Sequence, residues 1–376
     1  MTEHYLDNSA TTRVSQGAAD KAIELMRECY ANPSSLHSMG FSASKELEHA
    51  RDTIAKALGA DSSEIYFTSG GTEANNLAIL GCAHAHKRRG NRIVTTATEH
   101  SSVYETMLHL RDEGFEVIFV SPDITGGVSA QDVISQIDEK TILVSVMYIN
   151  NETGATNPIT EIAAAIKRRG LSTLLHTDAV QAFGKVDFKV ARLGAHLVSI
   201  SGHKIHAPKG VGALYVKKGV RILPHTFGGK QEKKLRPGTE SLPLIGAFGV
   251  AAEELDIQQS RDNAQTLRSY LLDKLSLIPQ VKVNSPSQGS PFILNFSVDG
   301  IRSETMLHHL AAQGVYVSSG SACSKGAKSH VLSAMNLPDN LADSAIRVSF
   351  SKHSTHEDCD ALLEGIRSGI ENLAKR

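Results

Sequence analysis

Two stretches decide the fold and the chemistry expected of this chain: His176-Thr-Asp-Ala-Val-Gln181 and Ser201-Gly-His-Lys204. Asp178 and Lys204 each follow an apolar run that predicts a strand, and 26 positions separate them. A lysine amine can hold the aldehyde of pyridoxal 5'-phosphate (PLP) as a Schiff base, while a carboxylate can keep the pyridine nitrogen protonated. Most single lysines and aspartates are solvated surface charges, so the pair gains meaning only from its place in a larger pattern.

That pattern is an alternation of strands and helices. The helical stretches include residues 72–86 and 160–169, the second closed by Gly170. Alternation of this kind indicates βαβ units and a largely parallel sheet with both faces covered, that is, an α/β fold. The expected strands are residues 65–68, 92–95, 116–120, 142–149, 171–176, 196–200 and 212–216.

Polar residues collect where these strands end. Ligands of parallel sheets bind at the carboxyl ends of the strands. Surface charges have no reason to fall in that register, so the sequence predicts one site at this edge. In chain order, the polar residues at the strand ends are Thr72, His100, Asn150, Asn151, Asp178, Gln181 and Lys204.

Length and charge narrow the class of protein. A chain of 376 residues exceeds one ordinary domain, so we expect two, with the boundary near 255–265, where residues 251–265 read as a polar-faced helix. The net charge of −1 gives no support for nucleic-acid or membrane binding. The N-terminal residues lack the features of a signal peptide and no run of 18 apolar residues occurs, so we expect a cytoplasmic protein. The cysteines show no metal-binding spacing and are expected as thiols: Cys29, Cys82, Cys323 and Cys359.

The stretch Thr68-Ser-Gly-Gly-Thr-Glu-Ala-Asn-Asn76 predicts a phosphate-binding turn. It follows a strand and opens a helix, so the backbone N–H groups of Gly71 and Thr72 can face an anion with the helix dipole behind them. A purely structural glycine turn is the alternative. Ser201 and His203 add side-chain donors of the type that a phosphate needs.

Two further residues are candidates for contacts with the PLP ring. His100 can stack on the pyridine ring and move a proton, although a histidine here can also simply cap the next helix. Gln181 follows Asp178 by three residues and would point its amide at the ring hydroxyl if the chain turns helical there.

Taken together, the residues resemble the cysteine desulfurases of the NifS/IscS group. These are fold-type I PLP enzymes of the class V aminotransferase superfamily, and the resemblance extends from Tyr5 to beyond Arg347. The matching segments are Tyr5-Leu-Asp-Asn-Ser-Ala-Thr-Thr12, Asn32-Pro-Ser-Ser35, Gly70-Gly-Thr-Glu-Ala-Asn-Asn76, Thr98-Glu-His100, Asn150-Asn-Glu-Thr-Gly154, Asp178-Ala-Val-Gln181, Ser201-Gly-His-Lys204, Pro208-Lys-Gly-Val-Gly-Ala-Leu-Tyr215, Arg236-Pro-Gly-Thr-Glu240, Ser318-Ser-Gly-Ser-Ala-Cys323 and Ile346-Arg-Val-Ser349.

The resemblance implies a role for each matching position. Lys204 would form the Schiff base, Asp178 would pair with the pyridine nitrogen, and Gln181 would bond the ring oxygen. It also implies a large domain over residues 14–256 with a mostly parallel seven-stranded sheet, and a smaller α+β domain from residues 1–13 and 257–376. His100 would stack on the ring, and the phosphate would be bound by Gly71, Thr72, Ser201 and His203. In a homodimer, Thr239 would contact the phosphate of the neighbouring subunit. Asn151 and Arg347 would bind the substrate carboxylate, and Cys323 would accept the sulfur.

The chemistry of the last two residues can be argued separately. Arg347 stands in an alternating strand pattern, where its planar guanidinium can form a fork to an α-carboxylate; a structural salt bridge is the alternative. Cys323 stands among small polar residues between Gly320 and Gly326, unlike the buried and inert cysteines of most proteins. A thiolate on such a loop can take sulfur from a PLP-bound cysteine and carry it to an acceptor protein.

We therefore expect a homodimeric PLP-dependent cysteine desulfurase that converts L-cysteine to L-alanine and leaves a persulfide on Cys323. The sulfur would serve iron-sulfur cluster assembly or tRNA or cofactor thiolation. His206 and Pro237 depart from the tyrosine and serine usual in the family, which bears on subunit contacts and the mouth of the site. The alternatives are an aminotransferase or a selenocysteine or cysteine lyase without persulfide transfer, and a catalytically idle binding partner.

Overall fold

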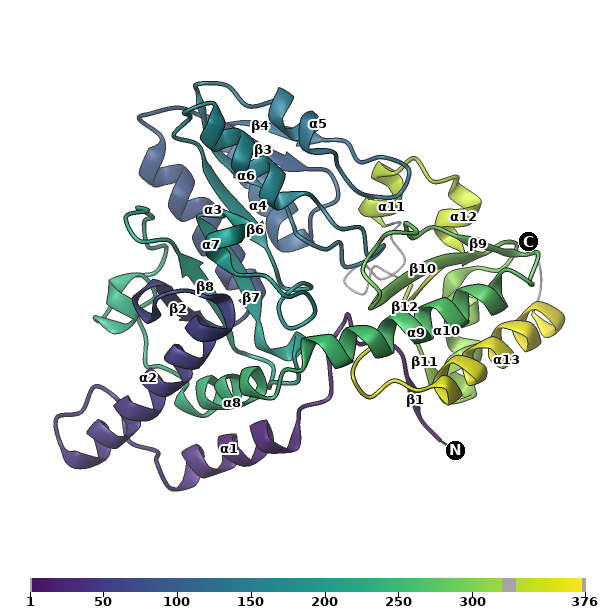
Figure 1. The fold of residues 1–376 in the computed structure, drawn as a ribbon, viewed down its shortest axis with the longest axis horizontal. Helices are drawn as coiled ribbons and strands as arrows, with labels where there is room; N and C mark the ends of the chain where they lie inside the picture. Colours follow the sequence, from purple (N-terminus) through teal and green to yellow (C-terminus); the bar gives the residue numbers. More distant parts are fainter. Residues whose placement is uncertain (1, 320–328, 374–376) are drawn as a thin grey trace.

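The computed structural model of the protein describes residues 2–319 and 329–373. Its largest sheet has seven strands (Figure 1). Its strands are β2 (Ile65–Thr68), β3 (Arg92–Thr96), β4 (Glu116–Val120), β5 (Thr141–Ser145), β6 (Leu174–Asp178), β7 (Leu197–Ser201) and β8 (Gly212–Val216). They are ordered β2-β8-β7-β6-β5-β3-β4. In this sheet β8 runs opposite to the other six strands, and the pairs among β3 to β7 are parallel, so the mostly parallel sheet is confirmed.

Successive residues of these strands feed two different apolar clusters, because side chains alternate between the faces of a sheet. Ile93 and Leu174 pack with helices α3 (Gly71–His86) and α4 (Ser101–Asp112). The next residues, Val94 and Leu175, belong to a cluster that contains side chains of α5 (Ala130–Ser135), α6 (Ile159–Arg168) and α7 (Val190–Leu193). Both faces are therefore covered, as the alternation of strands and helices predicts.

A second, smaller set of strands gathers near the C-terminus. β9 (Val281–Val283), β10 (Ile293–Val298) and β12 (Ala345–Ser349) form an antiparallel sheet in the order β12-β10-β9. The N-terminal strand β1 (His4–Tyr5) pairs with β11 (Val315–Tyr316), so the two ends of the chain lie in the same part of the molecule (Figure 1). The division into residues 14–256 against 1–13 and 257–376 stays a prediction, and the larger apolar cluster is continuous across that boundary.

The remaining helices complete the fold. None of the helices in the described residues is both long enough and apolar enough to cross a bilayer. These helices are α1 (Gln16–Arg27), α2 (Ser38–Leu58), α8 (Leu242–Glu253), α9 (Ile257–Leu275), α10 (Ser303–Ala312), α11 (His330–Ala334), α12 (Asp339–Asp343) and α13 (His356–Asn372), with short 3-10 turns η1 (Ser62–Glu64), η2 (Gly202–Lys204) and η3 (Gln231–Lys234).

Two expected strands have different ends. The strand expected over 142–149 ends at Ser145: Val146 and Tyr148 still donate to carbonyl oxygens of β6, but the backbone N–H of Met147 donates to the Glu99 carboxyl (2.9 Å). The strand expected over 171–176 begins at Leu174 and continues to Asp178, since the N–H of Leu171 bonds back to Ile166 at the end of α6. Asp178 is thus the last residue of β6 rather than a residue beyond it.

The single helix expected over 251–265 is wrong. The chain breaks between α8 and α9, and the carboxylate of Asp256 accepts a hydrogen bond from the backbone N–H of Gln259 (2.9 Å). An aspartate in this position caps a new helix. This capping signal outweighs the helical spacing of apolar residues that continues through the break.

Candidate active site

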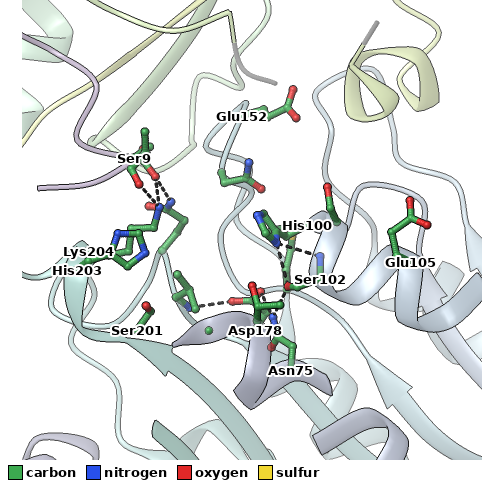
Figure 2. A pocket seen from close by; sticks show the side chains of 18 of the residues that line it. Ser9, Asn75, His100, Ser102, Glu105, Glu152, Asp178, Ser201, His203 and Lys204 are labelled. Carbon is green, nitrogen blue, oxygen red and sulfur yellow. Dashed lines mark hydrogen bonds between the residues drawn. The ribbon is translucent and has the colours of Figure 1, made fainter. Parts of the chain in front are cut away.

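A cavity of about 640 Å³ opens at the carboxyl ends of the parallel strands (Figure 2). Thr239 does not line it and is exposed, and Cys323 lies outside the described residues. The structure therefore brings together most of the site that the sequence predicts. The predicted residues that line the cavity are Gly71, Thr72, His100, Asn151, Asp178, Gln181, Ser201, His203, Lys204 and Arg347.

Asp178 is held by two hydrogen-bond donors at the end of β6. Its Oδ2 accepts from the Asn75 side-chain amide (2.7 Å) and its Oδ1 from the backbone N–H of Val180 (2.9 Å). Two N–H donors and the 5 % exposure of the residue suit an ionised carboxylate that faces a cationic partner. The same Asn75 amide also donates to Ser102 Oγ (2.9 Å), which extends the network toward α4.

His100 caps helix α4, as one interpretation of the sequence has it, and also lines the cavity, so its stacking on a cofactor ring stays a prediction. Its Nδ1 accepts from the backbone N–H of Ser102 (3.1 Å) and lies 2.9 Å from Ser102 Oγ. A backbone N–H can only donate, so the proton of the neutral ring is on Nε2. Burial lowers the pKa of His100, against the opposing effect of Asp178, and the charge of Lys204 lowers it further. The imidazole is therefore neutral near pH 7 and presents an N–H.

Lys204 ends the short η2 turn directly after β7 and meets the N-terminal segment of the chain. Its Nζ donates to the carbonyl oxygens of Ser9 (2.5 Å) and Ala10 (2.7 Å), as Figure 2 shows for Ser9. Sequence reasoning assigned no role to Ser9 or Ala10. The only signal was that both lie in a segment matched by the family resemblance.

The expected phosphate cradle lies between α3 and β7. A side chain at Gly71 would put its Cβ 2.7 Å from Val180 Cγ2, and Gly70 has a φ of +154°, so glycine is required at this approach. Ser201 Oγ is buried and makes no hydrogen bond to any described residue. A buried hydroxyl without a partner beside a helix N-terminus suits the binding of an anion. Burial, with Lys204 nearby, lowers the pKa of His203 to about 4, so this ring is neutral.

Arg347 enters the cavity from β12 in the smaller sheet. Nη2 contacts Asp7 Oδ1 at 2.7 Å, and Nη1 donates to the carbonyl oxygen of Asn151 at 3.1 Å. The guanidinium therefore forms a structural salt bridge and also lines the cavity, where the fork to a substrate carboxylate stays a prediction. Asn151 Oδ1 is buried without a hydrogen-bond partner among the described residues, which leaves it available for a ligand.

Several cavity residues were missed by sequence reasoning. Glu152 accepts a hydrogen bond from Ser329 Oγ (2.5 Å). Burial raises the pKa of Glu152, although this hydrogen bond and the charge of Arg347 act to lower it. His330 lies at the same end, with Nε2 2.8 Å from the carbonyl oxygen of Glu99. Asn75 and Glu152 fall inside motifs that carry the family resemblance, and that was their only signal; His330 had none.

The comparisons with known proteins identify the family of the chain. A model of the family described as aminotransferase class-V matches residues 4–362. The chain is 40% identical over 374 residues to a cysteine desulfurase IscS of Methanosarcina thermophila, covering 98% of this chain and 92% of that protein. It is 41% identical over 377 residues to a cysteine desulfurase IscS of Dictyoglomus turgidum, covering 99% and 95%.

Solved structures show the same fold. A NifS-like protein superposes with a TM-score of 0.94 at 38% identity, covering 99% of this chain and 100% of that one. A structure described as SspA in complex with cysteine superposes with a TM-score of 0.84 at 33% identity, covering 94% and 100%.

The residues present fit PLP. The unpartnered Ser201 hydroxyl and the glycine turn suit its phosphate, Asp178 suits its ring nitrogen, and Lys204 suits its aldehyde. The chain therefore belongs to the class V aminotransferase family and, within it, to the PLP-dependent cysteine desulfurases of the NifS/IscS group.

Proposed function

We propose that this cavity removes sulfur from L-cysteine through the roles assigned to Lys204, Asp178 and Arg347, with Cys323 as the sulfur acceptor. The observation that carries the proposal is the convergence of these first three residues on one cavity. They come from η2, β6 and β12, and no structural requirement of the sheet would bring a lysine, a carboxylate and a guanidinium to one space.

The cavity residues divide the work between cofactor and substrate. When bound, PLP accepts the electrons of the bond broken at the substrate α-carbon. Lys204 holds the cofactor and then moves protons at its Nζ, while Asp178 keeps the ring nitrogen protonated. Neutral His100 stacks on the ring and offers its Nε2–H, and Arg347 with Asn151 binds the α-carboxylate of cysteine. Gly71, Thr72, Ser201 and His203 hold the phosphate.

The sulfur step is assigned to the thiolate of Cys323. It attacks the sulfur of the bound cysteine, a sulfur–sulfur bond forms as the carbon–sulfur bond breaks, and the electron pair stays with the substrate carbon. That carbon then takes a proton, which gives alanine and an enzyme persulfide. Support comes from the sequence around Cys323 and from the family, since the segment lies outside the described residues.

Substitution of the thiol tests this proposal. Cys323→Ser should abolish alanine and sulfide formation from L-cysteine and leave PLP binding intact, because a serine hydroxyl is not ionised near neutral pH. In the unmodified protein, the peptide that contains Cys323 should gain the mass of one sulfur. Cys29→Ser is the matched control, since it removes a different thiol that the structure leaves free. Retained turnover in Cys323→Ser would favour the lyase or aminotransferase alternative.

The proposed functional unit is a homodimer. Large apolar side chains stand exposed between α1 and α2, on α2 itself and beside the segment 228–241 that carries Thr239, and a single chain leaves them in water: Tyr30 (67 %), Leu36 (105 %), Phe41 (62 %) and Phe227 (88 %). That segment is held rigidly, because the buried Glu232 pairs with Arg51 (2.8 Å) and Arg236 pairs with Glu73 (2.8 Å). Thr239 is exposed and does not line the cavity of its own chain, which supports the proposal that it reaches the phosphate of a partner chain.

Mixed dimers test the shared site. A Thr239→Ala chain and a Lys204→Ala chain should each lose activity, and mixing them should restore it in part, because one site of each heterodimer has both native residues. A fully active monomer in light scattering would contradict the proposal. The identity of the sulfur-acceptor protein, the pathway that it serves and a cytoplasmic location stay predictions.

A further inference from the structure

Lys185 is a buried cation outside the proposed chemistry. It follows β6 by seven residues, in the turn after Gln181, and the residue is only 7 % exposed. Burial lowers its pKa to about 7, and the nearby charges of Lys204 and Arg347 lower it further. A lysine this deep normally has a carboxylate partner.

No such partner is found in the described part of the chain. The Lys185 ammonium donates to Gln181 Oε1 (2.8 Å) and lies 5.8 Å from the ring centre of Phe292. Glu254 and Asp256 line a small neighbouring cavity with Lys185, but neither makes an ion pair with it. The other titratable groups that interact electrostatically with Lys185 are cationic or neutral: Lys204, His203, His206 and Arg347.

The partners of Gln181 fix the direction of its amide. The carbonyl oxygen of Ser9 can only accept, and a protonated Lys185 amine can only donate, so the amide oxygen faces Lys185. The amide nitrogen then faces the other way, and it donates to the carbonyl oxygen of Ser9 (2.9 Å). Its second N–H has no acceptor among the described residues, and Gln181 lines the cavity. A glutamine free to flip would offer either a donor or an acceptor to a ligand here.

We propose that Lys185 is a positioning residue that locks the Gln181 amide with an N–H toward the ring oxygen of bound PLP. The proposal rests on the function assigned to Gln181 above. An amide oxygen turned toward the ring oxygen would repel its negative charge, whereas the N–H stabilises it. Lys185 thereby favours the form of the cofactor in which the ring oxygen is ionised.

The absorbance of the protein-bound cofactor reports on this arrangement, because it changes with pH as the ring oxygen and the adjoining nitrogen gain or lose their shared proton. Lys185→Met should move the midpoint of that change upward by about one pH unit, the size expected for a lost hydrogen bond to a charged group. Lys185→Arg keeps the charge and the donors and should stay close to the native midpoint. The exposed Lys167 supplies the matched control Lys167→Met, which should move nothing.

A double-substitution cycle separates positioning from the simple loss of a nearby charge. Gln181→Ala alone should also raise the midpoint, and adding Lys185→Met to it should have little further effect. If Lys185→Met raised the midpoint by the same amount in the Gln181→Ala variant as in the native protein, Lys185 would act directly through its charge. That result would overturn the proposal. A native midpoint in Lys185→Met with lowered thermal stability would show a structural role only, with the same consequence.

The outcomes also separate this proposal from the assignment of Gln181. A normal midpoint in Gln181→Ala would overturn both, whereas a shifted midpoint in Gln181→Ala with none in Lys185→Met would overturn the positioning role alone. If Lys185→Met does not fold, Lys185→Gln replaces it, because an amide can donate or accept and no longer dictates the direction of Gln181. A smaller upward shift is then expected, and no shift would overturn the proposal.

Discussion

The two sides of the cavity handle charge in opposite ways. On one side, the anionic Asp178 is surrounded by neutral donors, namely the Asn75 amide and the backbone N–H of Val180. On the other, Lys204 donates to the backbone carbonyl oxygens of Ser9 and Ala10, and Lys185, next to the cavity wall, donates to the amide oxygen of Gln181. Figure 2 shows Asp178 with Asn75 and Lys204 with Ser9 as separate groups.

This difference shows how the site can hold a zwitterionic ligand. If Asp178 and Lys204 paired with each other, the charges needed for the ring nitrogen and for the aldehyde would already be neutralised. The neutral donors around Asp178 hold its charge in place without cancelling it, and in a buried site the remaining field acts strongly on a ligand. The cationic side then receives the anionic groups of cofactor and substrate.

Asp178→Asn should break the anionic side and have the largest effect. An amide cannot hold the ring nitrogen protonated, and removal of one member of a buried charge pair costs about 3–5 kcal/mol, or on the order of a hundred- to a thousandfold in turnover. Steady-state rates of alanine formation measure it. PLP should still attach covalently, because Lys204 and the glycine turn are unchanged. Turnover within a factor of a few of the native rate would show that the carboxylate is not needed.

On the cationic side, Arg347→Ala should weaken productive binding of cysteine far more than binding of PLP. Loss of a charge-assisted hydrogen bond costs about 1.5–3 kcal/mol, which corresponds to roughly ten- to a hundredfold in kcat/KM. Fluorescence titration of PLP and steady-state kinetics with cysteine separate the two.

The ion pair with Asp7 provides the control for that experiment. Asp7→Asn removes the salt bridge and leaves the guanidinium in the cavity. If the role of Arg347 were structural, both variants would lose activity and stability together. If the assignment is right, Asp7→Asn should keep most of the activity, and PLP loss with normal cysteine kinetics in Arg347→Ala would count against it.

The strand-end residues could be predicted from the sequence because their signal is local. Asp178, His100 and Lys204 each stand at or just after the end of an apolar run, and the parallel sheet brings such ends to one edge. The backbone carbonyls of Ser9 and Ala10 carry no such signal, since they reach Lys204 across more than half of the chain.

Hydrogen-bond networks between side chains could not be predicted from the sequence either. The orientation of Gln181 depends on Lys185, and a lysine in a turn between strands is normally a surface residue. Only the packing of the turn against Phe292 shows that it is buried. The roles of Thr239 and Cys323 stay predictions, because Thr239 does not line the cavity of its own chain and Cys323 lies outside the described residues.

On the anionic side, a second buried carboxyl group, that of Glu99, lies near Asp178. Burial raises the pKa of Glu99 to about 8, opposed by hydrogen bonds from Met147 and Thr96, and the charge of Asp178 raises it further. This side of the cavity therefore carries one ionised carboxylate and not two. In the unfolded chain the Glu99 carboxyl has its ordinary pKa near 4.5.

The smallest predicted effect follows from the sign of that shift. The folded state binds the Glu99 proton more tightly than the unfolded state, so this stabilisation is complete below about pH 4.5 and is lost as the pH rises to about 8. Glu99→Gln keeps an oxygen to accept from Met147 and Thr96 but has no proton to lose. Relative to the native protein, it should therefore be about equally stable near pH 5 and more stable by on the order of 1 kcal/mol or more at pH 8 and above. Thermal unfolding across this pH range measures the difference, with Glu139→Gln as the exposed control. A difference that does not change with pH would mean that Glu99 is already ionised in the folded protein, and that the anionic side holds two charges.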